Sequence, residues 1–276
     1  MKPVVKKAEP TKFKVIGTDY EVESVQELGK LLEKQWKKPK ERTLDEIEAE
    51  FNATYEKLRK QHPTAVKVIF RDGEKGYDRK NPEKVYAGGR DAYWSSHGPA
   101  SLFNERSENR GKSETHEIFM RHRSPLMKVD LETIAPTSRV LTAKLVITRA
   151  SKEYPKEHDP FARPTMWVAE PCGQAWDEYE VNAFQYRKND FWREIGGRYY
   201  RSEGPDFLPL YVAHGPGQGM VNEWDFTIAT RLWVASQFPN FGFMLHGDSR
   251  DWLVSAWTRE AKEIRNRPAL YVIYVP

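Results

Sequence analysis

Five aromatic side chains lie in segments without regular hydrophobic alternation, where a ring could be displayed on a loop. A flat indole or phenol can stack on the apolar C–H face of a pyranose ring, so residues of this type suit sugar binding. The alternative for each ring is burial in a core, which is the more common position of large aromatic side chains. These side chains are Trp94, Trp192, Tyr199, Tyr200 and Trp252. Five other tryptophans lie in predicted strands, in a predicted helix or in the ordered motifs described below, and we expect them in the core. They are Trp167, Trp176, Trp224, Trp233 and Trp257.

Arginine residues cluster in two regions of the chain. The first cluster contains Arg106, Arg110, Arg121, His122 and Arg123, and the second contains Arg193, Arg198 and Arg201. A guanidinium group binds a carboxylate or sulfate in a bidentate manner, which suits uronic-acid and sulfated glycans. The alternative is a solvated surface, because nearby glutamates neutralise much of the first cluster. Combining the aromatic and basic residues, we predict a ligand-binding set of Trp94, Arg121, Arg123, Trp192, Arg198, Tyr199 and Trp252.

The catalytic patterns that we considered give little support for an enzyme. The sequence contains no His-Glu-x-x-His, Gly-x-Ser-x-Gly, P-loop or dinucleotide-binding motif. Cys172 lies beside Pro171 and Gly173 with no histidine nearby in the sequence to activate it. A glycan hydrolase built on two carboxylates stays open as an alternative, although we interpret Glu178 and Glu260 as structural.

Two further chemical alternatives involve histidine and calcium. A glycan lyase could use Tyr and Arg together with one of three histidines, which are His97, His116 and His214. A structural Ca²⁺ ion could be bound by oxygen atoms of His158-Asp159, Asp248 and Asp251, although the EF-hand spacing is absent. Our prediction is a protein with no catalytic residues and no cofactor, with Ca²⁺ as the alternative.

Composition restricts the class of protein. The net charge of +4 is the small difference between 44 basic and 40 acidic residues, which does not predict nucleic-acid binding. The single cysteine excludes an intramolecular disulfide. No apolar run reaches the roughly 18 residues of a membrane span, and the polar segment from Met1 to Thr11 does not resemble a signal peptide.

The first part of the chain is predicted to be helical. Two capping boxes, Ser24 with Glu27 and Thr43 with Glu46, each precede a stripe of apolar residues at helical spacing. His62-Pro63 ends the second stripe. We therefore predict a flexible arm, a short strand near Phe13–Ile16 and a helical hairpin within residues 1–62.

From Val66 onward the apolar residues recur with a period of two, which is typical of a strand, and Asp72-Gly73 supplies a turn. Many short apolar runs separated by Pro- and Gly-containing loops predict a sandwich or barrel rather than a parallel sheet. Only Ile228–Gln237 has a helical pattern there. The predicted strands are Val66–Phe70, Ile118–His122, Leu141–Thr148, Met166–Ala169, Phe207–Val212, Trp224–Thr227, Phe241–His246, Leu253–Trp257 and Leu270–Tyr274.

Seven motifs in this second part follow one another in the order seen in a known family. They are Val68–Gly73 with Gly76-Tyr77, Gly89–Tyr93, Leu126–Leu131 with Leu141–Leu145, Trp176–Glu178 with Val181-Asn182, Asn240–Leu245, Ser255–Ala261 and Arg267–Leu270. In this order the region from about Val66 to Tyr274 resembles the DNRLRE, or disaggregatase-related, domain. The resemblance implies an antiparallel, jelly-roll-like β-sandwich over residues 63–276 that serves as a non-catalytic carbohydrate-binding module. The helical hairpin and the segments 152–163 and 191–204 are not part of that pattern.

The resulting functional hypothesis is an extracellular or cell-surface module that binds polysaccharide, with acidic glycans as the preferred class. The alternative is a structural or assembly subunit of such a complex. In that alternative the sandwich is a scaffold, and the apolar stripe between Val25 and Leu58 binds a protein partner or a second copy.

Overall fold

The computed structural model describes residues 13–14, 21–22, 42–95, 109–118, 123–150, 167–172, 174–182, 185–191, 221–247 and 254–276. Within these residues the chain is mostly antiparallel sheet, with two α-helices and one short 3₁₀-helix, Ile264–Asn266. A two-stranded pair near the N-terminus joins β1 (Phe13–Lys14) to β2 (Glu21–Val22), so the predicted early strand is present. The first predicted helix, after Ser24, lies outside the described residues.

The second predicted helix is confirmed as α2, Leu44–Gln61. Its capping box forms as predicted, because the Glu46 N–H donates to Thr43 Oγ1 (3.2 Å) and the Thr43 N–H donates to Glu46 Oε2 (2.9 Å). Acidic residues occupy the first turn and basic residues the last, which complements the helix dipole. The backbone leaves the helix at His62, immediately before Pro63.

The first four-stranded sheet has the order β11-β7-β14-β3. Its strands are β3 (Val66–Arg71), β7 (Arg139–Thr148), β11 (Val221–Asp225) and β14 (Ala269–Val275). β14 is paired on both edges, with Val272 opposite Val68 of β3 and opposite Ala143 of β7. The nearly continuous apolar sequence of β14 fits this position, because both of its faces are buried.

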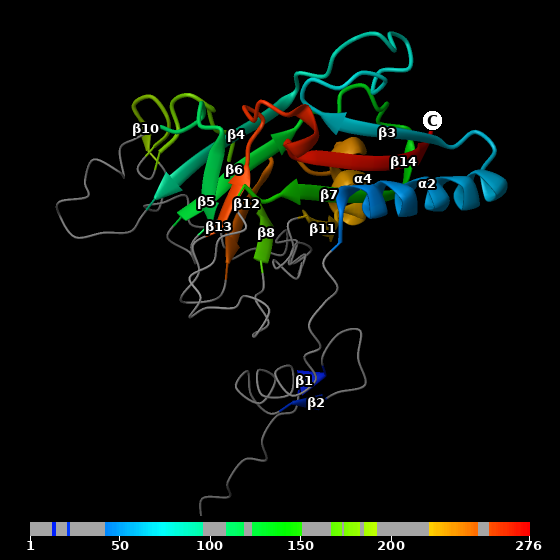
Figure 1. Ribbon diagram of the computed structural model, residues 1–276, viewed down its shortest axis with the longest axis horizontal. Helices are drawn as coiled ribbons and strands as arrows, with labels where there is room; N and C mark the ends of the chain where they lie inside the picture. Colours follow the sequence, from blue (N-terminus) through cyan, green and yellow to red (C-terminus); the bar gives the residue numbers. More distant parts are fainter. Residues whose placement is uncertain are drawn as a thin grey trace, which may run out of the picture.

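The second four-stranded sheet has the order β4-β6-β12-β8. Its strands are β4 (Gly89–Ser95), β6 (Arg123–Val129), β8 (Trp167–Pro171) and β12 (Phe243–Gly247). Two smaller antiparallel pairs accompany it, joining β5 (Thr115–Ile118) to β13 (Val254–Trp257) and β9 (Gln185–Arg187) to β10 (Asp190–Phe191). Figure 1 shows how these strands are arranged relative to α2.

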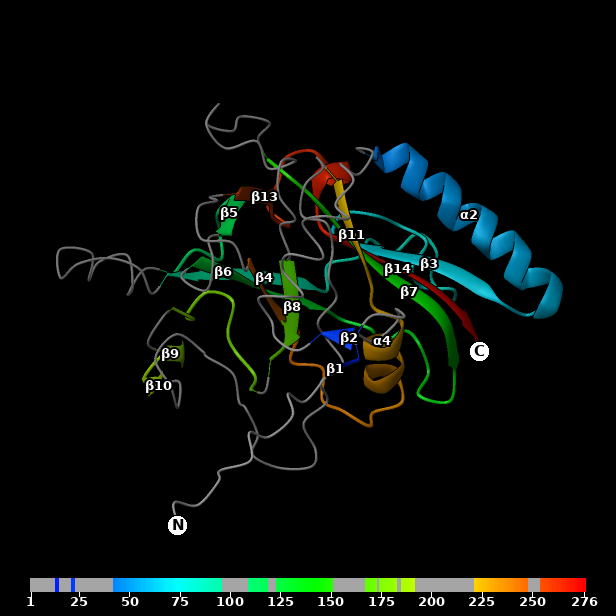
Figure 2. The same cartoon turned by 90° about the horizontal axis from the view of Figure 1, so that it is seen from below.

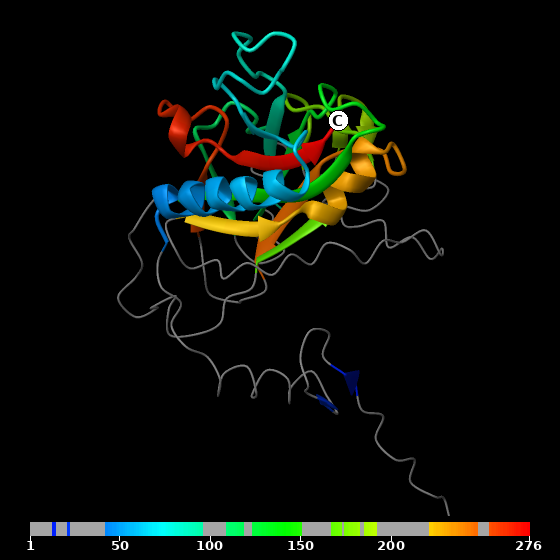
Figure 3. The same ribbon diagram turned by 90° about the vertical axis from the view of Figure 1, so that its right-hand side faces the viewer.

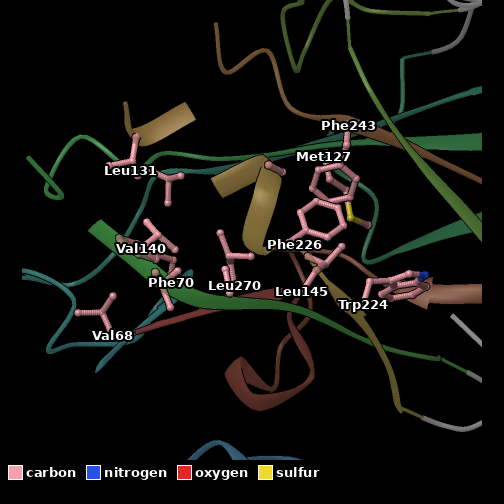
Figure 4. Close-up of a cluster of buried hydrophobic side chains, with 14 of the residues drawn as sticks. Val68, Phe70, Met127, Leu131, Val140, Leu145, Trp224, Phe226, Phe243 and Leu270 are labelled. Atoms are coloured by element: carbon pink, nitrogen blue, oxygen red, sulfur yellow. The ribbon is translucent and has the colours of Figure 1, made fainter. Parts of the chain in front are cut away.

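The main core draws its side chains from both four-stranded sheets (Figure 4). Phe70, Leu145 and Leu270 come from the first sheet, and Met127 and Phe243 come from the second. Helix α4 (Thr227–Val234) closes one side of this core, where Phe226 packs edge-to-face on Phe243 with ring centroids 5.0 Å apart.

Helix α2 covers the opposite face of the first sheet (Figure 3). Ile47 and Phe51 are buried against Val146, Tyr271 and Ile273, and the rings of Phe51 and Tyr271 meet edge-to-face at 5.1 Å. The apolar stripe of α2 therefore packs on the sheet of its own chain.

Most predicted strands within the described residues are present, with shifted ends. Of the strand predicted at Ile118–His122, residues 119–122 lie outside the described residues, and Ile118 is the last residue of β5. The strand predicted at Trp224–Thr227 ends at Asp225, because the Asp225 side chain accepts the Thr227 N–H (2.8 Å) and α4 begins there. The strand predicted at Phe207–Val212 lies outside the described residues.

No helix in the described part of the chain has the length and hydrophobicity needed to cross a membrane.

Candidate functional site

An open groove of about 600 Å³ lies where the end of α2 meets the start of β3 and the end of β14. This volume falls within the range of small-ligand sites. We call it the basic groove, and it is lined by Tyr55, Arg59, Pro63, Thr64, Ala65, Val66, Lys67, Arg79 and Pro276. None of these residues is acidic.

Tyr55 forms the aromatic part of the basic groove. The helical spacing places its ring beside the apolar cluster under α2, and its hydroxyl donates to the Ala65 carbonyl oxygen (3.3 Å). The Lys67 ammonium lies 5.1 Å from the ring centroid and the Arg59 guanidinium carbon lies 6.0 Å from it. The ring is thus held in one orientation, next to two cations.

The three cations of the basic groove have no carboxylate partner within 4.0 Å in the described part of the chain. Lys67 donates instead to the Asn52 side chain (2.5 Å). Burial raises the pKa of Tyr274, and the positive charge of Arg79 opposes that rise. Arg59, Lys67 and Arg79 are all exposed, so an anion can reach them.

The other half of α2 shows the opposite pattern. Glu48 pairs with Arg71 (3.4 Å) and Arg265 (3.1 Å), and Glu50 pairs with Arg42 (2.5 Å) and Lys144 (3.2 Å). The acidic residues of the first turns are therefore neutralised by cations of other elements. The unneutralised positive charge at the end of the helix can hold an anionic ligand, although a basic last turn also stabilises the helix dipole.

A second group of charged residues lies at the start of β4, and its three carboxylates are buried. The Arg259 guanidinium contacts Asp72 through Nε (3.1 Å), and through Nη1 it contacts Glu178 (3.2 Å) and the Gly89 carbonyl oxygen (2.5 Å). The Asp91 side chain accepts the Arg259 N–H (2.6 Å), and the Asp91 N–H donates to Glu178 Oε1 (2.9 Å). We call Asp72, Asp91, Glu178 and Arg259 the buried charge network.

Burial governs the ionisation of the buried charge network. It raises the pKa of the Asp72, Asp91 and Glu178 carboxyl groups, while Arg259 and backbone N–H groups oppose that rise. Glu178 is 5% exposed and is held on both oxygens, which agrees with the structural role predicted for it. A cavity of about 20 Å³ adjoins the network, which is room for about one water molecule.

His116 and Cys172 are the two described residues that the sequence offers as a lyase histidine and a nucleophilic thiol. His116 is buried, its Nε2 lies 3.1 Å from the Arg110 carbonyl oxygen, and burial lowers its pKa to about 4. Desolvation raises the pKa of the Cys172 thiol to about 12, so the thiolate needed for nucleophilic attack is disfavoured at neutral pH.

The ligand-binding residues predicted from the sequence lie largely outside the described residues. This holds for Arg121, Trp192, Arg198, Tyr199 and Trp252, and for the alternatives Tyr200, His97 and His214. Trp94 and Arg123 belong to the paired strands β4 and β6, opposite Ser124 and Ser95.

Two of the tryptophans predicted to be core are buried. Trp176 and Trp224 are 8% and 2% exposed, and Trp233 packs against the main core from a half-buried position. The His158-Asp159, Asp248 and Asp251 oxygens proposed for Ca²⁺ lie outside the described residues. Among the residues that are described, no three His, Cys, Asp or Glu side chains are grouped as metal ligands.

The residues of the basic groove were missed in the sequence. Tyr55 was assigned only to the apolar stripe of its helix, and Lys67 only to the polar side of an alternating strand. The one local signal is the absence of acidic residues from Lys57 to Val66, in a chain that otherwise mixes both signs of charge.

No protein-family model matches this chain, and no curated protein matches it either. The functional argument therefore depends on the residues of the chain itself.

Proposed function

We propose that this chain is a non-catalytic β-sandwich module that binds acidic polysaccharide in the basic groove. The observation that carries the proposal is the combination of one oriented tyrosine ring with three exposed cations that have no described carboxylate partner. A sugar ring can stack on Tyr55 while its carboxylate or sulfate contacts Arg59, Lys67 or Arg79.

The arrangement of the two four-stranded sheets supports the sandwich part of this proposal. Both sheets contribute to one core, and the strands within each are antiparallel. The disaggregatase-related family, an extracellular location and a jelly-roll connection remain proposals that rest on the ordered motifs.

Burial of the α2 stripe weakens one basis of the assembly alternative. Ile47 and Phe51 contact the sheet of their own chain, so this half of the predicted hairpin has no large apolar face left for a partner. A role in assembly would then have to use other surfaces.

Affinity electrophoresis of the full chain tests the proposal. Native gels containing an acidic glycan, such as alginate, pectate or a sulfated polysaccharide, are compared with gels containing a neutral glucan at low and physiological salt. We expect retention by at least one acidic glycan, weaker at higher salt because ionic contacts are screened.

A charge-matched pair of variants identifies the site. Replacing Arg59, Lys67 and Arg79 with Gln should lower the affinity at least tenfold, or about 1.4 kcal/mol or more. Lys57, Lys75 and Lys262 are exposed and do not line the groove, so replacing them with Gln removes the same charge and should leave most of the binding. Equal losses in both variants would indicate only a net-charge effect, and the groove assignment would be wrong.

A further inference from the structure

A second exposed aromatic ring, Tyr179, lies on the loop that precedes β9. It is 49% exposed, whereas its neighbour Glu178 is 5% exposed and points into the buried charge network. The two consecutive side chains therefore have opposite roles, one as an anchor and the other as a displayed ring.

The backbone on which Tyr179 stands is held by its neighbours. The Tyr179 N–H donates to Asp177 Oδ1 (2.9 Å). Asn109 Nδ2 donates to the carbonyl oxygens of Glu178 (2.8 Å) and Val181 (2.9 Å), which fixes the loop on either side. Because the loop is fixed in this way, it loses little backbone freedom when a ligand stacks on the Tyr179 ring.

A cation without a described carboxylate partner accompanies this ring. The Lys112 ammonium lies 5.6 Å from the Tyr179 ring centroid. Lys112 is brought there because Gly111 packs against the Glu178 carbonyl, where a Cβ atom would collide with that oxygen. The position thus repeats the pairing of Tyr55 with Lys67 in the basic groove.

The β9–β10 hairpin extends this surface. The Lys188 N–H donates to Glu180 Oε2 (2.9 Å), and the Asp177 N–H donates to the Tyr186 carbonyl oxygen (2.8 Å), so the hairpin and the loop form one unit. The hairpin carries Phe191, which is 68% exposed, as well as the exposed Lys188. Two exposed rings, Tyr179 and Phe191, accompanied by the exposed Lys112 and Lys188 suit a chain of acidic sugars.

We propose that Tyr179, Lys112 and Phe191 form a second binding site for acidic polysaccharide, separate from the basic groove. Figures 1 and 2 place the β9–β10 hairpin and α2 on opposite sides of the molecule. This inference rests on the proposed function, and it adds that one chain holds a polymer at two sites. Two sites joined in one molecule bind a long polymer more tightly than a short oligosaccharide by raising the effective concentration.

Hydrogen exchange measured by mass spectrometry, on the full chain with and without the retained acidic polysaccharide, tests this second site. We expect slower exchange in peptides covering residues 174–191 as well as in those covering residues 55–67. Protection confined to residues 55–67 would overturn the second site and leave the groove intact. Protection confined to residues 174–191 would support the second site and overturn the groove. Absence of binding by the wild-type chain to any acidic glycan would overturn both.

Substitutions give an independent measurement. Tyr179→Ser combined with Phe191→Ser should weaken binding of the polymer about tenfold, whereas Tyr179→Phe keeps the ring and should weaken it less than about threefold. The matched control is Ile228→Ser, which removes another exposed apolar side chain, 47% exposed on α4, and should leave the affinity unchanged. Wild-type affinity in the double variant, or an equal loss in the control, would overturn the proposal.

Discussion

Replacing Arg259 with Met should destabilise the fold strongly, although Arg259 lies partly at the surface. Methionine keeps much of the side-chain volume but removes the guanidinium contacts to Asp72, Glu178 and the Gly89 carbonyl oxygen. The Asp72 and Glu178 side chains are only 7% and 6% exposed, so water cannot replace the lost partner.

The magnitude follows from the cost of leaving a buried charge without its partner, about 3–5 kcal/mol. Burial already raises the pKa of both carboxyl groups, and loss of Arg259 would raise it further. A carboxyl group with a raised folded-state pKa binds more protons in the folded state, so the stability of the variant falls as pH rises. The loss should therefore be larger at pH 8 than at pH 5.

Urea unfolding followed by tryptophan fluorescence measures this effect. With a slope of about 2 kcal/mol/M, a loss of 4 kcal/mol lowers the midpoint by about 2 M. The matched control is Arg265→Met, because Arg265 also contacts two carboxylates, Asp45 and Glu48, but is itself 53% exposed. That change should cost less than about 1 kcal/mol. If both variants lose the same stability, or if the loss does not depend on pH, burial of the charge network does not determine its contribution.

Three further predictions concern stability. His116→Gln should remove a pH dependence of stability of about 3 kcal/mol. The folded-state pKa of His116 is about 4, below the ordinary 6.5, so the wild-type protein loses stability as pH falls through that interval. Urea midpoints measured from pH 4 to 8 should therefore change less with pH in the variant than in the wild type. Thr43→Ala should cost about 1 kcal/mol by removing the N-cap of α2, and Thr43→Ser should retain most of it in thermal unfolding; equal melting temperatures for all three proteins would contradict this. Gly242→Ala should cost about 2–4 kcal/mol, since the φ of Gly242 is +84° and a Cβ would collide with the Met127 carbonyl oxygen. Gly76 has a φ of +85° but open space around it, so Gly76→Ala should cost about 1 kcal/mol. The reverse order of the two losses in chemical denaturation would refute the steric argument.

Local patterns in the sequence were sufficient to predict whole elements. The capping box at Thr43 and Glu46 fixed the start of α2, and His62-Pro63 fixed its end. The alternation from Val66 to Phe70 and the apolar run from Leu270 to Tyr274 placed β3 and β14. These patterns depend on residues within a few positions of one another, so they can be recognised without knowledge of the tertiary structure.

The candidate sites could not be found by the same reasoning. Arg259 and Glu178 are 81 positions apart in the chain, and the basic groove combines Tyr55 and Lys67 with Arg79. Their proximity depends on strand register and on the packing of α2 against the sheet.

The sequence by itself determined the second predicted helix, the strands with a clear apolar run, such as β3, β7 and β14, and the antiparallel, β-rich class of the protein, because side-chain period and capping are local properties. The tertiary structure alone decided which charges are buried and paired, which are exposed without a described partner, and which aromatic rings are displayed. Those properties arise from contacts between distant segments, so the consecutive residues Glu178 and Tyr179 differ in exposure and in role.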